Sequence, residues 1–338
     1  MEGEDLFVLL ISSKTKIIAL ILLLVIGSAF IFQDKAVRYF CGVKSGVMFL
    51  EHNVGGYSRE ELTELIGAKY GEWVVSPVDA VYDEQYNSII PELWGCEVNL
   101  QKTVDKIMQA HSGEKVTLVL ETLLPDITLN DYPWAYIRQG NPLKTEVSFM
   151  INVAWGTEYI PQMLAILDNE KVSASFFVVG SWAENHEDLL RQISNSGHTV
   201  ENHGHTDAKV YTELTPEEME DGLKKVNSFV QNLTGRKPKY YTPHKGEYNE
   251  LVLEAVSRQE LRTVLWSIDT IDWMLPGVQA MKSRVLENLH GGAIVLMHPT
   301  EDTVIFLRET IPLIKDQGFQ IVSIEKLLDP NYNRTEFK

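Results

Sequence analysis

The chain has 338 residues, of which 44% are hydrophobic and 23% charged, so it can form one large domain and a smaller one and is not intrinsically disordered. Its net charge of −17 argues against a nucleic-acid partner, because such binding needs clustered lysines and arginines. Its two cysteines, Cys41 and Cys96, are too few for a disulfide framework or a thiolate zinc site. A single bridge between them and two separate thiols both stay open.

The first predicted element is an apolar segment near the N-terminus. Residues 17–32 carry no charge, with Lys14 and Lys16 before them and Lys35 soon after. This run is slightly short for a membrane span of about 20 residues, and residues 27–29 are small enough for a signal cleavage site. Because the apolar run continues beyond Ala29, we expect residues 1–36 to be a cytoplasmic tail and an uncleaved single-pass anchor in the cell membrane. The bulk of the chain would then be extracytoplasmic; secretion after signal cleavage is the alternative.

Residues 44–130 predict a small α/β domain. Ser58 and Glu61 have the spacing of a capping box, so a helix should begin after Ser58 and run to about Tyr70. A second helix is expected at 100–111 and an alternating strand at 115–121. The phrases GGYSREE and LWGCEVNLQKTV resemble a peptidoglycan-binding repeat, which implies a cell-wall-binding domain, although a spacer domain would have the same elements. The turn-rich residues 131–145 predict a linker.

Strands and helices alternate through residues 146–330. Apolar strands are expected at 147–151, 173–179, 199–201, 240–242, 263–268, 293–297 and 320–323. Seven strands with intervening helices predict an α/β fold, a distorted (β/α)7 barrel with a parallel sheet. In such barrels the chemistry lies at the carboxyl ends of the strands. The unusual residues fall there: Asn152, His203, Pro243, His244, Asp269, Asp272, Trp273 and His298.

Several phrases of this region resemble the motifs of the polysaccharide deacetylase family, the NodB-homology domains of carbohydrate esterase family 4. They are SASFFV from Ser173, GHTVENHGHTD from Gly197, LWSIDTIDW from Leu265 and GAIVLMH from Gly292. The resemblance implies hydrolysis of N- or O-acetyl groups on cell-wall or other polysaccharides. It also implies a divalent metal, zinc or similar, held by one Asp and two His, a second carboxylate as general base, and a His that protonates the leaving nitrogen.

The residues at these positions depart from the family pattern. Asn152 stands at the base position and Val153 at that of the metal-binding Asp. An amide does not take a proton from water near neutral pH, and an aliphatic side chain ligates nothing. His203 matches the first metal-binding His and Asp207 the second, where a carboxylate remains an acceptable ligand. Thr242 replaces the Arg that tunes the base.

Other motif residues are retained. His298 stands at the position of the leaving-group acid, near Asp269 and Asp272. The resemblance implies a substrate groove whose walls include Pro243, His244, Trp273 and Leu296. A purely structural alternative is that Asp269 or Asp272 satisfies His298 as a packing residue.

Three hypotheses follow. The favoured one is a membrane-anchored polysaccharide deacetylase family protein that acts on or binds cell-wall glycan or peptidoglycan but is catalytically impaired, with little metal. The second is an active deacetylase with a rebuilt site, in which His203, Asp207 and either His205 or His244 hold the metal and Asp269 or Asp272 is the base. The third is a structural scaffold of the cell envelope.

Overall fold

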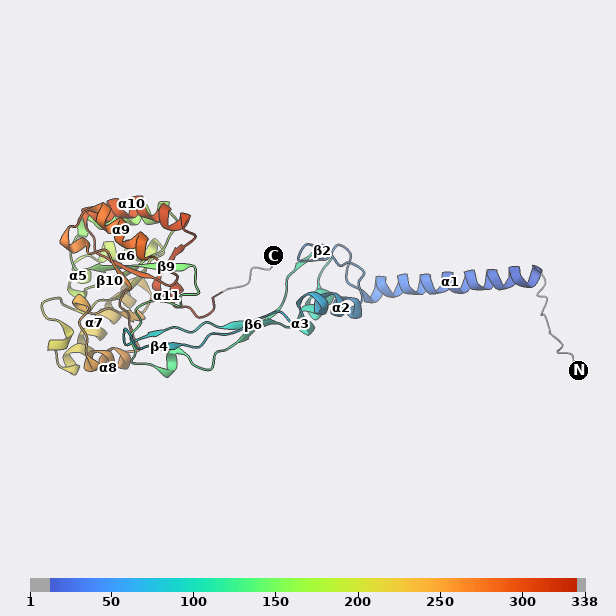
Figure 1. Ribbon diagram of the computed structural model, residues 1–338, viewed down its shortest axis with the longest axis horizontal. Helices are drawn as coiled ribbons and strands as arrows, with labels where there is room; N and C mark the ends of the chain where they lie inside the picture. The colour runs from blue at the N-terminus through green and yellow to red at the C-terminus, as the bar shows by residue number, and fades with distance from the viewer. Residues whose placement is uncertain (1–12, 333–338) are drawn as a thin grey trace, which may run out of the picture. The chain divides into compact units, whose positions relative to one another are not determined.

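The computed structural model describes residues 13–332, which belong to two compact units (Figure 1). The first unit comprises Met1–Val75 and Cys96–Leu123, and the second comprises Ser76–Gly95 and Leu124–Lys338. The segment Ser76–Gly95, which we expected within the small domain, therefore belongs with the larger unit. Cys41 and Cys96 keep separate thiols rather than a disulfide.

The chain's first described element is α1 (Ser13–Cys41). Our expectation of a membrane anchor is wrong: among the helices of residues 13–332, none is long and apolar enough to cross a membrane. The uncharged run at 17–32 has sixteen residues, which as a helix cover about 24 Å, whereas the hydrocarbon core is about 30 Å thick. The first twelve residues of the expected tail lie outside the described part of the chain.

Besides α1, the described part of the first unit contains two helices and two small sheets. The predicted capping box of α2 (Arg59–Tyr70) is confirmed, because the Ser58 hydroxyl accepts from the Glu61 amide at 3.2 Å and the Glu61 carboxylate accepts from the Ser58 amide at 2.9 Å. α2 packs against α3 (Leu100–Gln109). One sheet contains β2 (His52–Asn53), β1 (Met48–Phe49) and β7 (Lys115–Val116), and the other contains β3 (Val74–Val75), β6 (Gly95–Val98) and β8 (Leu120–Leu123).

The second unit is built on an eight-stranded parallel sheet of order β13-β12-β11-β10-β9-β15-β14, with β16 also paired to β9. Its strands are β9 (Glu146–Val153), β10 (Ser175–Val178), β11 (Thr199–Asn202), β12 (Tyr240–Tyr241), β13 (Arg262–Thr263), β14 (Ile268–Asp269), β15 (Ile294–Met297) and β16 (Gln320–Val322). The barrel-like α/β prediction is confirmed in this form. The single strand expected at 263–268 is two strands, because Ile137 pairs with Val264 and accepts from the Leu265 amide at 2.8 Å between them.

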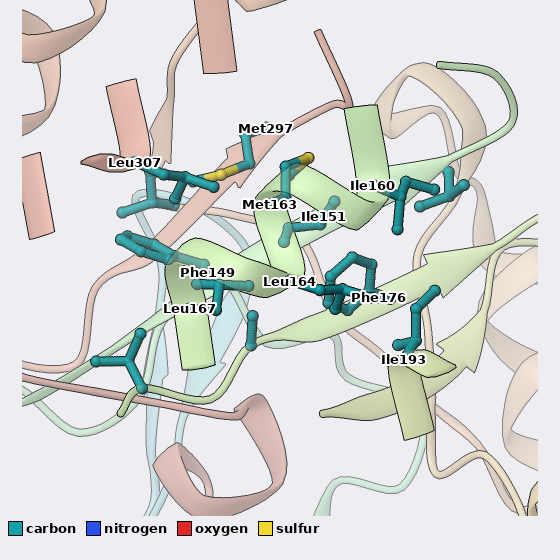
Figure 2. Close-up of a cluster of buried hydrophobic side chains, with 14 of the residues drawn as sticks. Phe149, Ile151, Ile160, Met163, Leu164, Leu167, Phe176, Ile193, Met297 and Leu307 are labelled. Atoms are coloured by element: carbon teal, nitrogen blue, oxygen red, sulfur yellow. The ribbon is translucent and has the colours of Figure 1, made fainter. Parts of the chain in front are cut away.

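Helices cover the outer face of this sheet. They are α4 (Ile160–Asn169), α5 (Gly180–Asn185), α6 (Glu187–Asn195), α7 (Pro216–Thr234), α8 (Glu250–Arg258), α9 (Val278–Asn288) and α10 (Glu301–Asp316). Figure 2 shows part of this layer, where Phe149 and Phe176 of the central strands pack with Met163 and Leu167 of α4. The whole of β9 is buried, as expected for a strand with packed layers on both faces.

The inner face of the sheet is covered by segments from outside the alternating pattern. Met150 and Leu296 of the sheet form a core with Ile137, with Ile89 of the hairpin formed by β4 (Val81–Asp83) and β5 (Ser88–Ile90), and with α11 (Ile324–Leu327). Residues 131–145 are therefore packed against the sheet, and this part of the chain is not the open linker that its turn-rich composition predicted. The inner-face position of Met150 is shared by Asn152, two residues further along β9.

Candidate functional site

The carboxyl ends of the parallel strands bring the predicted site residues to one end of the sheet. Asn152 lies at the end of β9, and His203 directly follows β11. His244 follows β12, and His298 follows β15. Because all these strands are parallel, the loops that carry the side chains emerge on the same side.

The first motif contributes two uncharged side chains to this end of the sheet. Asn152 is 4% exposed, and its Oδ1 has no hydrogen-bond partner within the described residues. Val153 is fully buried and packs in the outer hydrophobic core. Neither side chain can act as a general base or supply a negatively charged metal ligand.

His203 and His244 form a close pair of imidazoles. Their ring centroids are 4.2 Å apart. The Nδ1 atom of His203 lies 2.8 Å from the Thr242 carbonyl oxygen. Since that oxygen only accepts, Nδ1 carries the proton and Nε2 of the neutral ring keeps a lone pair.

Burial keeps both imidazoles neutral. It lowers the pKa of His203 well below its usual value, and the nearby His244 and His298 lower it further. Burial also lowers the pKa of His244, against the opposing effects of Asp207 and of a backbone hydrogen bond with Thr206. His244 is 7% exposed, and its buried Nε2 has no hydrogen-bond partner in residues 13–332.

The two other polar residues of the second motif lie differently. Asp207 is exposed to solvent on the loop after β11. His205 turns toward Glu184, whose Oε1 lies 3.3 Å from its Nε2, and Lys225 reaches the same carboxylate at 3.2 Å. His205 therefore belongs to a different cluster of side chains from His203 and His244.

These residues do not fit the divalent metal that the family resemblance implies. The position of the metal-binding Asp is taken by Val153, which has no donor atom. Within the described part of the chain, no group of three His, Cys, Asp or Glu side chains is arranged to hold a metal ion. A structural zinc needs four ligands and a catalytic zinc three, so we assign no catalytic step to a metal.

Asp272 and His298 form a pair of connected side chains. The fully buried Asp272 accepts from His298 Nδ1 at 2.8 Å, from the His298 amide at 2.5 Å and from the Thr303 hydroxyl at 2.9 Å. These bonds fix the His298 ring with Nε2 unprotonated in the neutral form. Asp269 instead accepts from the Ile271 amide at 2.8 Å, and burial raises the pKa of Asp269.

The expected walls of the groove divide into exposed and buried residues. Trp273 is 56% exposed, on a turn whose flanking residues Ile271 and Leu275 have φ of 55° and 52°. Such left-handed conformations are costly for branched residues and are frequent at functional sites. Pro243 and Leu296 are buried, so they support the site from beneath.

Trp155 is a site residue that the sequence analysis missed. Its ring stacks on His298, with centroids 5.9 Å apart and an interplanar angle of 6°, and the residue is 45% exposed. The signal was present in the motif, since Trp155 and Gly156 directly follow the first-motif residues Asn152–Ala154. Gly156 has φ of 74°, and a Cβ there would lie 2.1 Å from the Pro299 carbonyl oxygen, so the loop can approach β15 only with glycine.

Comparisons with known proteins agree on one family. A family model described as polysaccharide deacetylase matches residues 139–264. The uncharacterized protein YlxY of Bacillus subtilis is 35% identical over 272 residues, which are 80% of this chain and 85% of YlxY. The peptidoglycan-N-acetylmuramic acid deacetylase PdaA of Bacillus subtilis is 29% identical over 196 residues, 56% of this chain and 73% of PdaA.

The solved structures that align with this chain include one described as a pseudoenzyme. A wild-type pseudoenzyme of the CE4 family from Bacillus anthracis aligns with a TM-score of 0.68 and 31% identity, covering 80% of this chain and 95% of that one. A mutant of the same pseudoenzyme, described as having restored enzymatic activity, aligns with a TM-score of 0.68 and 30% identity, covering 80% and 98%.

Proposed function

Since this chain belongs to the polysaccharide deacetylase family, we propose that it is a member that binds cell-wall glycan and whose own deacetylase activity is impaired. The observation that carries the proposal is the replacement of both first-motif carboxylates by a buried amide, Asn152, and a buried aliphatic residue, Val153. The similarity to PdaA, which is named for its action on peptidoglycan, supports peptidoglycan as the glycan. The likeness of the first unit to a peptidoglycan-binding repeat points to the same ligand class.

The absence of a general base should lower the rate of hydrolysis by a large factor. A positioned general base contributes about 10² to 10⁴ in rate, and Asn152 can orient a water molecule but cannot deprotonate it. The His298 imidazole, held by Asp272, would protonate a leaving nitrogen only after a nucleophile has attacked. An acid without a base leaves the first step of hydrolysis without assistance.

The two acidic residues do not replace the lost base. Both oxygens of Asp272 are occupied by His298 and Thr303, and the carboxyl is fully buried. Asp269 is hydrogen-bonded to the backbone of its own turn. The hypothesis of an active enzyme with a rebuilt site has little support from these contacts.

The retained surface favours binding. Trp155, which stacks on the oriented His298 imidazole, and Trp273 both have exposed aromatic rings, and partly exposed aromatic walls with a few polar groups are typical of ligand sites. A scaffold protein would not need this combination at the carboxyl ends of its strands.

The test uses the purified full-length chain with acetylated peptidoglycan and chito-oligomers. We expect the glycan to be retained by the protein and no acetate to be released above the protein-free control. Acetate release that disappears in His298→Ala would refute the impaired-enzyme proposal. Failure to bind any glycan would favour the scaffold hypothesis instead.

A further inference from the structure

Arg138 lies outside the phrases that resemble the family motifs, at an edge of the parallel sheet. The residue before it, Ile137, pairs in parallel with Val264, and the Ile137 carbonyl oxygen accepts from the Leu265 amide at 2.8 Å. The chain therefore runs here in the same direction as the strands, and Arg138 follows the point of pairing. This places Arg138 toward the carboxyl ends of the strands, the end of the sheet that carries the candidate site.

Two packing contacts join this edge of the sheet to the loop that carries His244. The Trp266 ring lies against Gly246 of that loop, where an added Cβ would be 3.1 Å from the ring. The Tyr136 ring packs against the Tyr248 ring just beyond the loop, with centroids 4.7 Å apart. The surface around this edge is therefore continuous with the third-motif loop of the candidate site.

The Arg138 side chain is held from two directions. Its guanidinium carbon lies 3.8 Å from the centre of the Tyr86 ring, and its Nε donates to the Trp266 carbonyl oxygen at 3.1 Å. Tyr86 is anchored in turn, because its carbonyl oxygen accepts a hydrogen bond from the Tyr136 hydroxyl. An arginine that is stacked and hydrogen-bonded in this way loses little conformational freedom when it binds a ligand.

The outer edge of this guanidinium has no partner in the described part of the chain. Nη1 and Nη2 of Arg138 donate to no atom of residues 13–332, and no carboxylate in that range forms an ion pair with them. The chain has 47 Asp and Glu against 30 Lys and Arg, and Arg38, Arg59 and Arg258 each pair with a carboxylate. Arg138 is partly exposed, so an acidic ligand can reach it from solvent.

We propose that Arg138 binds a carboxylate of the glycan, so that the protein recognises peptidoglycan through acidic groups that chito-oligomers lack. This inference rests on the proposed glycan-binding function. A guanidinium can bind a carboxylate through two parallel N–H···O bonds, and both terminal nitrogens of Arg138 face no competing acceptor of the described chain. Peptidoglycan has carboxylates on the lactyl group of its muramic acid and on its peptides, whereas N-acetylglucosamine oligomers are uncharged.

The test compares ligands that differ in these carboxylates. Isothermal titration calorimetry of the full-length chain would use the N-acetylglucosamine tetramer, a peptide-free tetramer of alternating N-acetylglucosamine and N-acetylmuramic acid, and the same tetramer with its peptides. We expect an acidic tetramer to bind about tenfold more tightly than the uncharged one, because hydrogen bonds to charged groups are among the stronger ones. Tighter binding without peptides would identify the lactyl carboxylate, and tighter binding only with peptides would identify a peptide carboxylate.

Matched variants assign the preference to Arg138. Arg138→Gln should bring the affinity ratio of acidic to uncharged tetramer close to one. Tyr86→Leu keeps the charge but removes the ring that holds the guanidinium, so it should lower the ratio, and it serves as the test if Arg138→Gln fails to fold. Arg308→Gln, at an exposed position of α10, is the control, because it changes the net charge equally and should keep the wild-type ratio.

Three results would overturn the inference. Equal binding of all three tetramers by the wild type would do so and leave the proposed function standing. A preference for the acidic tetramers that survives Arg138→Gln would place the carboxylate at another residue. Binding of no tetramer would overturn both the inference and the proposed function. If Arg138 only held the β4–β5 hairpin, Arg138→Gln would lower Tm without changing the affinity ratio.

Discussion

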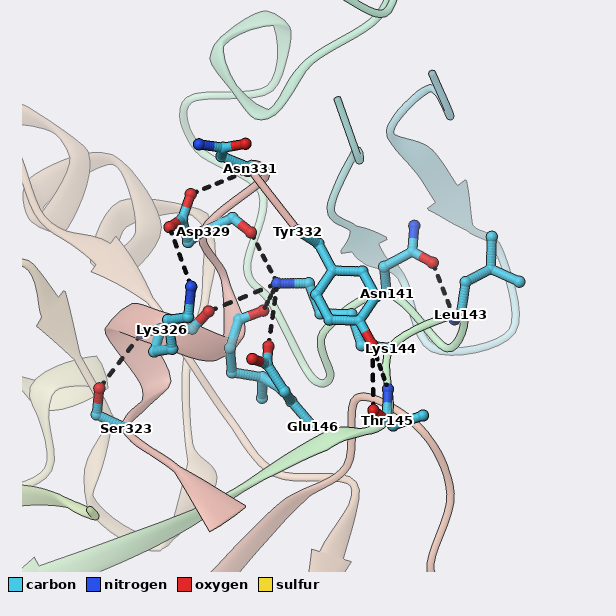
Figure 3. A network of polar contacts seen from close by, with 11 residues as sticks. Asn141, Leu143, Lys144, Thr145, Glu146, Ser323, Lys326, Asp329, Asn331 and Tyr332 are labelled. Atoms are coloured by element: carbon cyan, nitrogen blue, oxygen red, sulfur yellow. Dashed lines mark hydrogen bonds and ion pairs between the residues drawn. The ribbon is translucent and has the colours of Figure 1, made fainter. Parts of the chain in front are cut away.

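Lys144 is the buried cation whose removal should destabilise the larger unit most clearly (Figure 3). Its ammonium group lies 2.6 Å from the Leu327 carbonyl oxygen, 2.7 Å from that of Asp329 and 3.6 Å from the Glu146 carboxylate. These contacts hold the end of α11 and the following segment against the start of β9. Lys144→Ala leaves a buried carboxylate and two carbonyl groups without their donor.

The magnitude follows from these contacts. Removing one partner of a buried ion pair costs about 3 to 5 kcal/mol. Burial lowers the pKa of Lys144, against Glu146 and Asp329, so desolvation offsets part of the favourable interaction in the native protein. We therefore expect the lower end, about 3 kcal/mol, which for a domain of this size lowers Tm by about 6 to 12 °C.

Thermal unfolding followed by circular dichroism is the assay. Lys237→Ala is the matched control, since the Lys237–Glu260 pair at 2.6 Å is on the surface and should contribute little. The double variant Lys144→Met/Glu146→Leu should recover most of the lost stability, because it leaves no buried charge unpaired. Equal changes in Tm for Lys144→Ala and Lys237→Ala would refute the reasoning.

Three further predictions concern the barrel unit. Burial raises the pKa of Glu201 from 4.5 to about 7. The contribution of the protonated Glu201 carboxyl to stability is therefore complete below pH 4.5 and is lost as the pH rises through 7. Between pH 4.5 and 8, the free energy of unfolding of Glu201→Gln should therefore rise relative to that of the wild type by on the order of 3 kcal/mol, as measured by urea unfolding. A difference between the two proteins that does not change with pH would contradict this. Gly156→Ala should lower Tm by several degrees, because its Cβ would meet the Pro299 carbonyl oxygen; an unchanged Tm would show that the loop can move. In ¹⁵N NMR, His298 should carry its neutral-form proton on Nδ1, and Asp272→Asn should shift the population toward Nε2–H; an unchanged tautomer would show that Asp272 does not set it.

Local signals in the sequence were reliable where they depended on near neighbours. The capping box predicted at Ser58 is formed, because its partner Glu61 is three residues away. The central strands β9 and β10 were visible as continuous apolar runs, which are typical of strands buried on both faces. The placement of His203 and His298 at one end of the sheet followed from the parallel alternation alone.

Other features depended on partners far along the chain. The break between β13 and β14 arises from Ile137, more than a hundred residues earlier, and no local pattern indicates it. The direction of His205, on the loop after β11, is set by Glu184 on α5. The apolar run at 17–32 was misleading, because its composition is that of a transmembrane helix although the run is too short to cross a membrane.

The sequence predicted which residues belong to the site better than it predicted how their side chains are arranged. Asn152 and Val153 were identified from the first motif. The stacking of Trp155 on His298 and the exclusive pairing of Asp272, rather than Asp269, with that histidine required the folded turns.

The central claim of the proposed function is that replacement of the family's general base and metal ligands impairs hydrolysis by this chain. The triple variant Asn152→Asp/Val153→Asp/Asp207→His returns the base and the metal ligands that the family pattern has. The relevant precedent is the mutant of the Bacillus anthracis pseudoenzyme with restored activity. Circular dichroism would verify that the variant is folded.

The most direct measurement is acetate release from N-acetylated oligomers by the wild-type chain and by this triple variant, each supplied with zinc. The account predicts no release by the wild type and a measurable rate for the variant. Release by the wild type at the rate of the variant would contradict it.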